Sequence, residues 1–92
     1  MKAIYKNTVI AESDDTIVVE NNHYFPPDAV KMEYLQKSPT PYTCPWKGKC
    51  QYFNVVVDGE TLPDTAWSYP DPKEAAAKIK GYIAFWKDVK VL

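Results

Sequence analysis

QYFNVVVDGETLPDTAWSY, residues 51–69, predicts a β-hairpin and with it the fold class of the chain. Gln51–Val57 is rich in β-branched and aromatic residues, which favour a strand. Asp58-Gly59 is the clearest hairpin turn in the chain, because a two-residue type I′ turn needs a positive φ at both positions. Thr61–Tyr69 returns as the partner strand. Pro63 indicates an edge or a bulge there, since proline cannot donate to a strand ladder.

Short strands are also predicted on both sides of this hairpin. Polar pairs such as Asn21-Asn22, which tolerate a positive φ, separate apolar runs in the first quarter of the chain and indicate a β-meander. Two more apolar runs follow near the C-terminus and are broken at Lys87-Asp88. The predicted strands outside the hairpin are residues 2–5, 8–11, 16–20, 23–25, 82–86 and 89–92.

Prolines and a capping pattern predict the segments that are not strands. Three prolines between residues 38 and 45 predict a loop there. One short helix is predicted near residues 72–80, with Asp71 as its N-cap, Glu74 completing a capping box and Gly81 ending it. Together these patterns predict a small, mainly β domain of antiparallel sheets with one short helix.

Size and charge limit the possible partners of the protein. A chain of 92 residues is long enough for one hydrophobic core, so residues 1–92 are expected to form a single domain. The net charge is −1 and all eleven basic residues are lysines, so neither a nucleic acid nor a membrane is an expected partner. No apolar run reaches the length of about 18 residues that a membrane span needs, and no signal peptide is recognised. These observations predict a cytoplasmic protein with reduced cysteines.

Few side chains suit catalysis, and no metal or cofactor is predicted. His23 is the only histidine, and nothing in the sequence establishes a contact between it and a cysteine. Five residues separate Cys44 from Cys50, whereas zinc knuckles have about two to four. Lys47 and Lys49 lie close to Cys44 in the sequence and would favour its thiolate. The alternative is that Cys44 is a small buried apolar residue.

Aromatic residues are abundant and gather around one loop. Tyr, Trp and Phe make up 14% of the chain, and Trp46 stands between Tyr42 and Tyr52. Trp67 and Tyr69 lie on the returning strand of the predicted hairpin. These rings either form a cleft that stacks a planar or sugar-like ligand or form the core of a small β domain. The residues alone leave both alternatives open.

Four motifs occur in an order that is specific enough to match a known family. They are Y-F-P at 24–26, T-C-P-W-K-G at 43–48, D-T-A-W-S-Y-P at 64–70 and G-Y-I-A-F-W at 81–86. The chain resembles the bacterial domain-of-unknown-function family 427 nearly from end to end. The resemblance implies a β-tent-like fold, in which two sheets meet at an angle. The zinc sites of many β-tent proteins are not carried over, because this chain has no Cys-x-x-Cys knuckles.

Members of this family are sometimes labelled nucleotidyltransferase-like. Such chemistry needs acidic residues that hold magnesium around a triphosphate, and no acidic cluster lies near the motifs of this chain. The resemblance therefore implies no accepted activity, and whether the protein is an enzyme stays open. The motif residues of the family correspond to Tyr24, Thr43, Cys44, Pro45, Trp46, Lys47, Gly48, Trp67, Tyr69 and Pro70.

The leading hypothesis is a small-ligand-binding domain whose cleft is built from the TCPWKG loop and the AWSYP strand. Trp46, Trp67 and Tyr69 would form the walls, and Lys47 would pair with one charged group of the ligand. The alternatives are a protein-interaction module that uses the same surface and a thiol-dependent enzyme centred on Cys44. The expected ligand-binding residues are Tyr24, Thr43, Cys44, Trp46, Lys47, Gly48, Trp67 and Tyr69.

Overall fold

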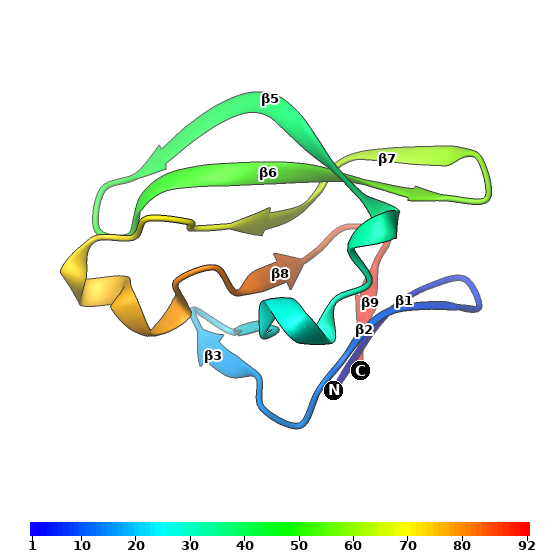
Figure 1. The fold of residues 1–92 in the computed structure, drawn as a ribbon, viewed down its shortest axis with the longest axis horizontal. Helices are drawn as coiled ribbons and strands as arrows, with labels where there is room; N and C mark the ends of the chain where they lie inside the picture. The colour runs from blue at the N-terminus through cyan, green and yellow to red at the C-terminus, as the bar shows by residue number, and fades with distance from the viewer.

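The computed structural model describes all residues from 1 to 92, and most of its regular structure is antiparallel strand (Figure 1). The strands are β1 (Lys2–Tyr5), β2 (Thr8–Glu12), β3 (Ile17–Val19), β4 (Asn22–Tyr24), β5 (Leu35–Cys44), β6 (Gly48–Val57), β7 (Glu60–Ser68), β8 (Ile83–Phe85) and β9 (Lys90–Val91). Three short 3₁₀ segments are η1 (Pro27–Ala29), η2 (Met32–Tyr34) and η3 (Glu74–Ile79). The predicted fold class, mainly β with antiparallel sheets, is confirmed. None of the helical segments is long and apolar enough to cross a membrane.

The strands form three sheets. The largest has the order β5-β6-β7-β8, the second has the order β2-β1-β9, and β3 pairs with β4 alone. Figure 1 shows β5, β6 and β7 across the top of the molecule, with β1, β2 and β9 running at a steep angle beneath one end. The backbones of Lys2 and Leu92 exchange hydrogen bonds of 2.8 and 2.9 Å, so the two termini lie side by side.

The hairpin of residues 51–69 forms as predicted. Asp58-Gly59 has positive φ angles of 50° and 80° and connects β6 to β7 in a two-residue turn. The pairing register shifts on the β7 side between Leu62 and Ala66, so Pro63 lies in a bulge. The bulge accommodates proline in a strand that has neighbours on both sides.

Each face of the four-stranded sheet has its own hydrophobic cluster, because successive residues of a strand point to opposite faces. On β8, Ile83 and Phe85 pack into the first cluster, whereas Ala84 between them packs into the second. The first cluster consists of Ala3, Tyr5, Ile10, Ala11, Phe25, Val30, Phe53, Val55, Val57, Ala66, Ile83, Phe85 and Val89. The second consists of Val19, Tyr24, Cys44, Cys50, Trp67, Tyr69, Ala76, Ile79 and Ala84.

The N-terminal strands form, but they do not make one continuous meander. β1 pairs with β2 and β9, whereas β3 and β4 pair only with each other. The outer edge of β2 is met by Val30 in an isolated bridge to Ala11. The hairpin of β3 and β4 lies beside β8, because Phe25, directly after β4, forms an antiparallel bridge with Ile83. Val19 and Tyr24 of the hairpin pack into the second cluster.

The predicted loop over residues 38–45 is wrong, because most of it belongs to strand β5. β5 is the edge strand of its sheet, a position in which a residue without an N–H can face away from the ladder. Its register with β6 also shifts between Lys37 and Pro41, and Pro39 lies within that shift. Edge position and irregular pairing together accommodate the prolines.

The predicted helix occupies the expected region but is not the predicted structure. Its residues Glu74–Ile79 form two 3₁₀ turns separated at Ala76, where φ is −117°. The N-cap is Lys73, without a side-chain capping bond, so the capping box between Asp71 and Glu74 does not form. Tertiary contacts explain the difference: Ala76 and Ile79 are buried in the second cluster, and packing overrides local helix propensity.

Candidate functional site

The T-C-P-W-K-G motif forms the connection between β5 and β6. Residues 45–47 make the turn, and Gly48 opens β6 with a φ of 107°, which favours glycine. The backbone N–H of Lys73 donates to the carbonyl of Lys47 at 2.9 Å, and its ammonium donates to the carbonyl of Pro45 at 2.7 Å. A β-carbon on Gly48 would lie 3.4 Å from the backbone nitrogen of Lys73. The turn is therefore fixed against the segment that precedes η3.

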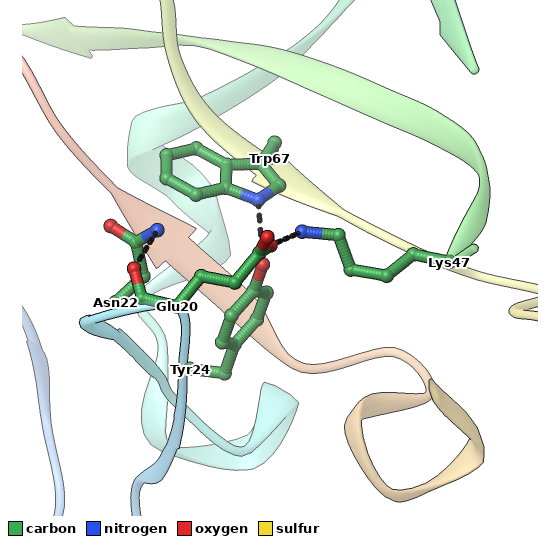
Figure 2. Close-up of polar contacts among 5 residues, drawn as sticks. All are labelled: Glu20, Asn22, Tyr24, Lys47 and Trp67. Atoms are coloured by element: carbon green, nitrogen blue, oxygen red, sulfur yellow. Dashed lines mark hydrogen bonds and ion pairs between the residues drawn. The ribbon is translucent and has the colours of Figure 1, made fainter. Parts of the chain in front are cut away.

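Lys47 points inward from this turn, and its ammonium forms an ion pair with the carboxylate of Glu20 (Figure 2). Only 8% of its side chain is exposed, and Nζ lies 5.3 Å from the ring centroids of both Trp46 and Tyr69. Burial alone would lower the pKa of Lys47. The hydrogen bond to Glu20, together with nearby negative charge, outweighs burial and holds this pKa above its ordinary value. The amine is therefore charged at neutral pH.

Glu20 reaches this amine from the turn between β3 and β4. Glu20 and Asn21 both have positive φ angles, 53° and 65°, which fit a two-residue hairpin turn. The Glu20 side chain is 55% exposed, far more than its partner Lys47. The hydrogen bond and charge of Lys47 lower the pKa of Glu20. The side-chain amide of Asn22 donates to the carbonyl of Glu20 at 3.4 Å and steadies the turn (Figure 2).

Beside this ion pair lies a cleft with a volume of about 370 Å³. Its walls come from the β3–β4 hairpin, the β5–β6 hairpin, the end of β7 and the residues that follow β7 and β8. Five of its seven lining residues are aromatic, and one is the buried residue Lys47. We refer to it as the aromatic cleft; its lining residues are Asn22, Tyr42, Lys47, Tyr52, Trp67, Tyr69 and Trp86.

The rings of the aromatic cleft contact one another in a chain. Tyr42 and Tyr52 have centroids 6.3 Å apart, and Tyr52 lies nearly parallel to Trp86 at 6.4 Å. Trp86 in turn meets Trp67 edge to face, with centroids 5.3 Å apart. Tyr42 and Trp86 remain 47% and 42% exposed, so their surfaces are free at the rim.

Hydrogen bonds hold both tryptophans of the cleft in place. The indole N–H of Trp67 donates to the hydroxyl of the fully buried Tyr24 at 3.1 Å (Figure 2). The indole N–H of Trp86 donates to the backbone carbonyl of Asp64 at 2.6 Å. The carboxylate of Asp64 accepts hydrogen bonds from the hydroxyls of Ser38 and Thr40. The bond from Ser38 is the main reason why the pKa of Asp64 is lowered. These hydrogen bonds fix the two indole rings in the wall of the cleft.

Comparison with known families identifies the family of this chain. A family model described as a domain of unknown function (DUF427) matches residues 1–91, almost the whole chain. The chain belongs to this family. The resemblance predicted from the four motifs is thereby confirmed. A search among curated proteins found no match.

The DUF427 domain brings three of the eight predicted ligand-binding residues, Lys47, Trp67 and Tyr69, to the lining of the aromatic cleft. Tyr24 and Cys44 lie buried behind it in the second cluster. The other three belong to the β5–β6 hairpin but not to the lining: Thr43, Trp46 and Gly48. Trp46, expected as a wall, is 40% exposed and contacts the amine of Lys47 instead.

The predicted ligand-binding set lacks four of the seven residues that line the cleft in the DUF427 structure: Asn22, Tyr42, Tyr52 and Trp86. It also lacks Glu20, which pairs with Lys47 beside the cleft. Tyr42 and Tyr52 were noted only as rings that flank the motif loop. Trp86 could have been recognised as a site residue from the sequence, because it ends the G-Y-I-A-F-W motif. Asn22 was recognised as a turn residue, and nothing in its local sequence indicates a second role. The pairing of Glu20 with Lys47 spans 27 residues and has no local signature.

Both thiols of the DUF427 domain are free and buried. Burial raises the pKa of Cys50 to about 11, so this thiol is protonated at neutral pH. Cys44 packs in the second cluster, as in the alternative of a small buried apolar residue. The structure holds no group of three or more His, Cys, Asp or Glu side chains that could bind a metal ion.

Proposed function

We propose that this DUF427 domain binds a small ring-shaped ligand, planar or sugar-like, in the aromatic cleft. The observation that carries the proposal is the continuous chain of rings from Tyr42 to Trp67 beside a buried ammonium group. A volume of about 370 Å³ lies within the range of about 300–1,000 Å³ that is typical of small-molecule sites. Aromatic walls with few polar groups are also typical of such sites.

The concave shape supports a small ligand over the alternative of a protein-interaction module. A protein partner would be favoured by exposed apolar side chains on a flat or convex surface. Here the exposed rings of Tyr42 and Trp86 line a hollow, where each can offer its surface to an inserted ring. We propose no reaction, and the buried thiols of Cys44 and Cys50 give no support to thiol chemistry. Two free thiols support the cytoplasm as the proposed location.

Replacing Trp86 with alanine tests the proposal. The probe is indole, a neutral planar bicycle, and binding is followed by NMR through the side-chain N–H signals of Trp67 and Trp86. We expect indole to shift both signals in the wild type. Trp86→Ala should weaken binding by about 1–3 kcal/mol, the usual contribution of one stacking ring. The shift of the remaining Trp67 signal reports the dissociation constant in the variant.

Trp46→Ala is the matched comparison, because Trp46 is about as exposed as Trp86 but does not line the cleft. It should weaken indole binding much less than Trp86→Ala does. Equal losses in the two variants would contradict the aromatic cleft as the site. If neither indole nor methyl β-glucoside, as a sugar probe, shifts the Trp67 signal at millimolar concentration, the proposed function is wrong.

A further inference from the structure

We infer that the ligand carries a carboxylate, which takes the place of the Glu20 carboxylate on the Lys47 ammonium. In this arrangement Glu20 is an internal competitor that occupies the charged end of the cleft while no ligand is bound. The inference rests on the proposed function and deepens it, because it assigns the chemical class of the ligand: a ring that bears one carboxylate.

The ion pair is asymmetric in a way that allows exchange. Lys47 lines the cleft with a side chain that is only 8% exposed, and its ammonium lies 5.3 Å from the ring centroid of Tyr69, another lining residue. A buried ammonium needs a negative partner at all times. The carboxylate of Glu20 is more than half exposed and can return to water at little cost. A carboxylate that enters through the cleft can therefore replace Glu20 without leaving either charge buried and unpaired.

The positions of the two partners fit this exchange. Glu20 is held by the turn of a short hairpin whose strands have three residues each, whereas Lys47 is fixed through its own backbone to Lys73. An ammonium group has three donors, and a single carboxylate oxygen of Glu20 is bonded to it. The amine also lies over the ring of Tyr69, which belongs to the cleft lining. A carboxylate at the end of a stacked ring can reach this amine from the cleft side.

One carboxylate fits better than a phosphate group. The cleft offers a single ammonium, which neutralises a single negative charge. A phosphate monoester carries a charge near −2 at neutral pH and is usually held by several donors, often by the planar fork of arginine. The chain has no arginine, and Lys47 is the basic residue of the cleft lining. A carboxylate repeats the interaction that Glu20 makes now.

Two probes of the same shape test the exchange: indole-3-acetate, which carries a carboxylate, and its neutral amide, indole-3-acetamide. Their dissociation constants are measured by NMR titration of the Trp67 side-chain signal in the wild type and in Glu20→Gln. Removing the competing charge should tighten binding of indole-3-acetate about tenfold and change binding of indole-3-acetamide less than about twofold. In Lys47→Gln the two probes should bind alike.

Glu12→Gln is the matched control, since Glu12 is an exposed residue, paired with Lys2, and its replacement changes the net charge equally. Equal tightening of indole-3-acetate in Glu12→Gln and Glu20→Gln would overturn the exchange, because a general charge effect would then suffice. Equal changes for both probes in Glu20→Gln would also overturn it, while the ring-binding function would stand. If indole-3-acetate and indole-3-acetamide fail to bind the wild type and every folded variant, the exchange is wrong; if indole and methyl β-glucoside fail as well, the proposed function is wrong too.

Discussion

The two faces of the four-stranded sheet differ in the chemistry of the side chains that cover them. The first cluster consists of aliphatic side chains, phenylalanines and a single tyrosine, Tyr5. The second cluster mixes small aliphatic residues with side chains that carry a polar tip or a thiol: Tyr24, Cys44, Cys50, Trp67 and Tyr69. The first face is covered by strands of another sheet, whereas the second opens into the aromatic cleft.

The polar tips on the second face are satisfied inside the protein. Trp67 donates to Tyr24, and the buried amine of Lys47 pairs with a carboxylate. No buried side-chain nitrogen or oxygen lacks a hydrogen-bond partner. Rings fixed in this way have little conformational freedom left to lose. One face of the sheet is packed for stability, whereas the other uses hydrogen bonds to keep a concave surface in shape.

The largest expected loss of stability comes from removing a large side chain from the first cluster. Phe25 is fully buried there, with its ring centroid 5.8 Å from that of Phe85. Phe25→Ala removes most of a buried ring and leaves a cavity, so the free energy of unfolding should fall by about 3–5 kcal/mol. Urea unfolding followed by circular dichroism measures the change. A loss below about 1 kcal/mol would contradict the assignment of the first face as the stabilising core.

Tyr24, the neighbour of Phe25 in the sequence, tests the second face, and its replacement is expected to change stability less. Tyr24→Phe removes one hydroxyl and leaves the buried indole N–H of Trp67 without its acceptor. The unfolding free energy should fall by about 1–3 kcal/mol, the desolvation penalty of a buried unpaired donor. The same urea titration measures it, and the N–H signal of Trp67 should move in the NMR spectrum. An unchanged Trp67 signal would show that this hydrogen bond does not hold the ring.

Much of the fold could be predicted because its signals are local. Asp58-Gly59 fixes a hairpin through its own backbone preferences, and the strands beside it alternate with turn residues that tolerate positive φ. The positive φ values at Asp58 and Gly59 match the predicted turn. These features depend on neighbours in the sequence, and the structure keeps them.

The features that the sequence could not supply depend on distant contacts. The prolines of β5 fit a strand because β5 lies at a sheet edge, which is a property of the whole topology. The segment Glu74–Ile79 takes 3₁₀ geometry because two of its residues must be buried in the second cluster. Trp86 replaces Trp46 as a wall because β8 pairs with β7 and brings the end of its strand to the cleft.

The smallest expected effect on the free energy of unfolding comes from the ion pair between Lys47 and Glu20. Its dependence on pH distinguishes a contribution of the Glu20 charge from a contribution of Glu20 packing. Because Lys47 lowers the pKa of Glu20 below its ordinary value of 4.5, the folded state binds this proton less tightly than the unfolded chain does. The stabilisation is therefore fully present above about pH 4.5 and is lost as the pH falls through the lowered pKa of the folded state.

Glu20→Gln should accordingly be less stable than the wild type at pH 7, and the difference should shrink towards zero on acidification. Urea unfolding of both proteins between about pH 3 and 7 measures this difference, with Glu12→Gln as the control for net charge. The lowered pKa values of Glu60 and Asp64 also destabilise the protein in acid, but they affect the wild type and Glu20→Gln equally and cancel in the difference. A difference that stays constant over this range would mean that Glu20 contributes packing rather than charge. In that event an incoming carboxylate could not take over the role of Glu20 at Lys47. The proposed difference between the first face, which is closed by packing, and the second face, whose ion pair can be exchanged, would then be wrong.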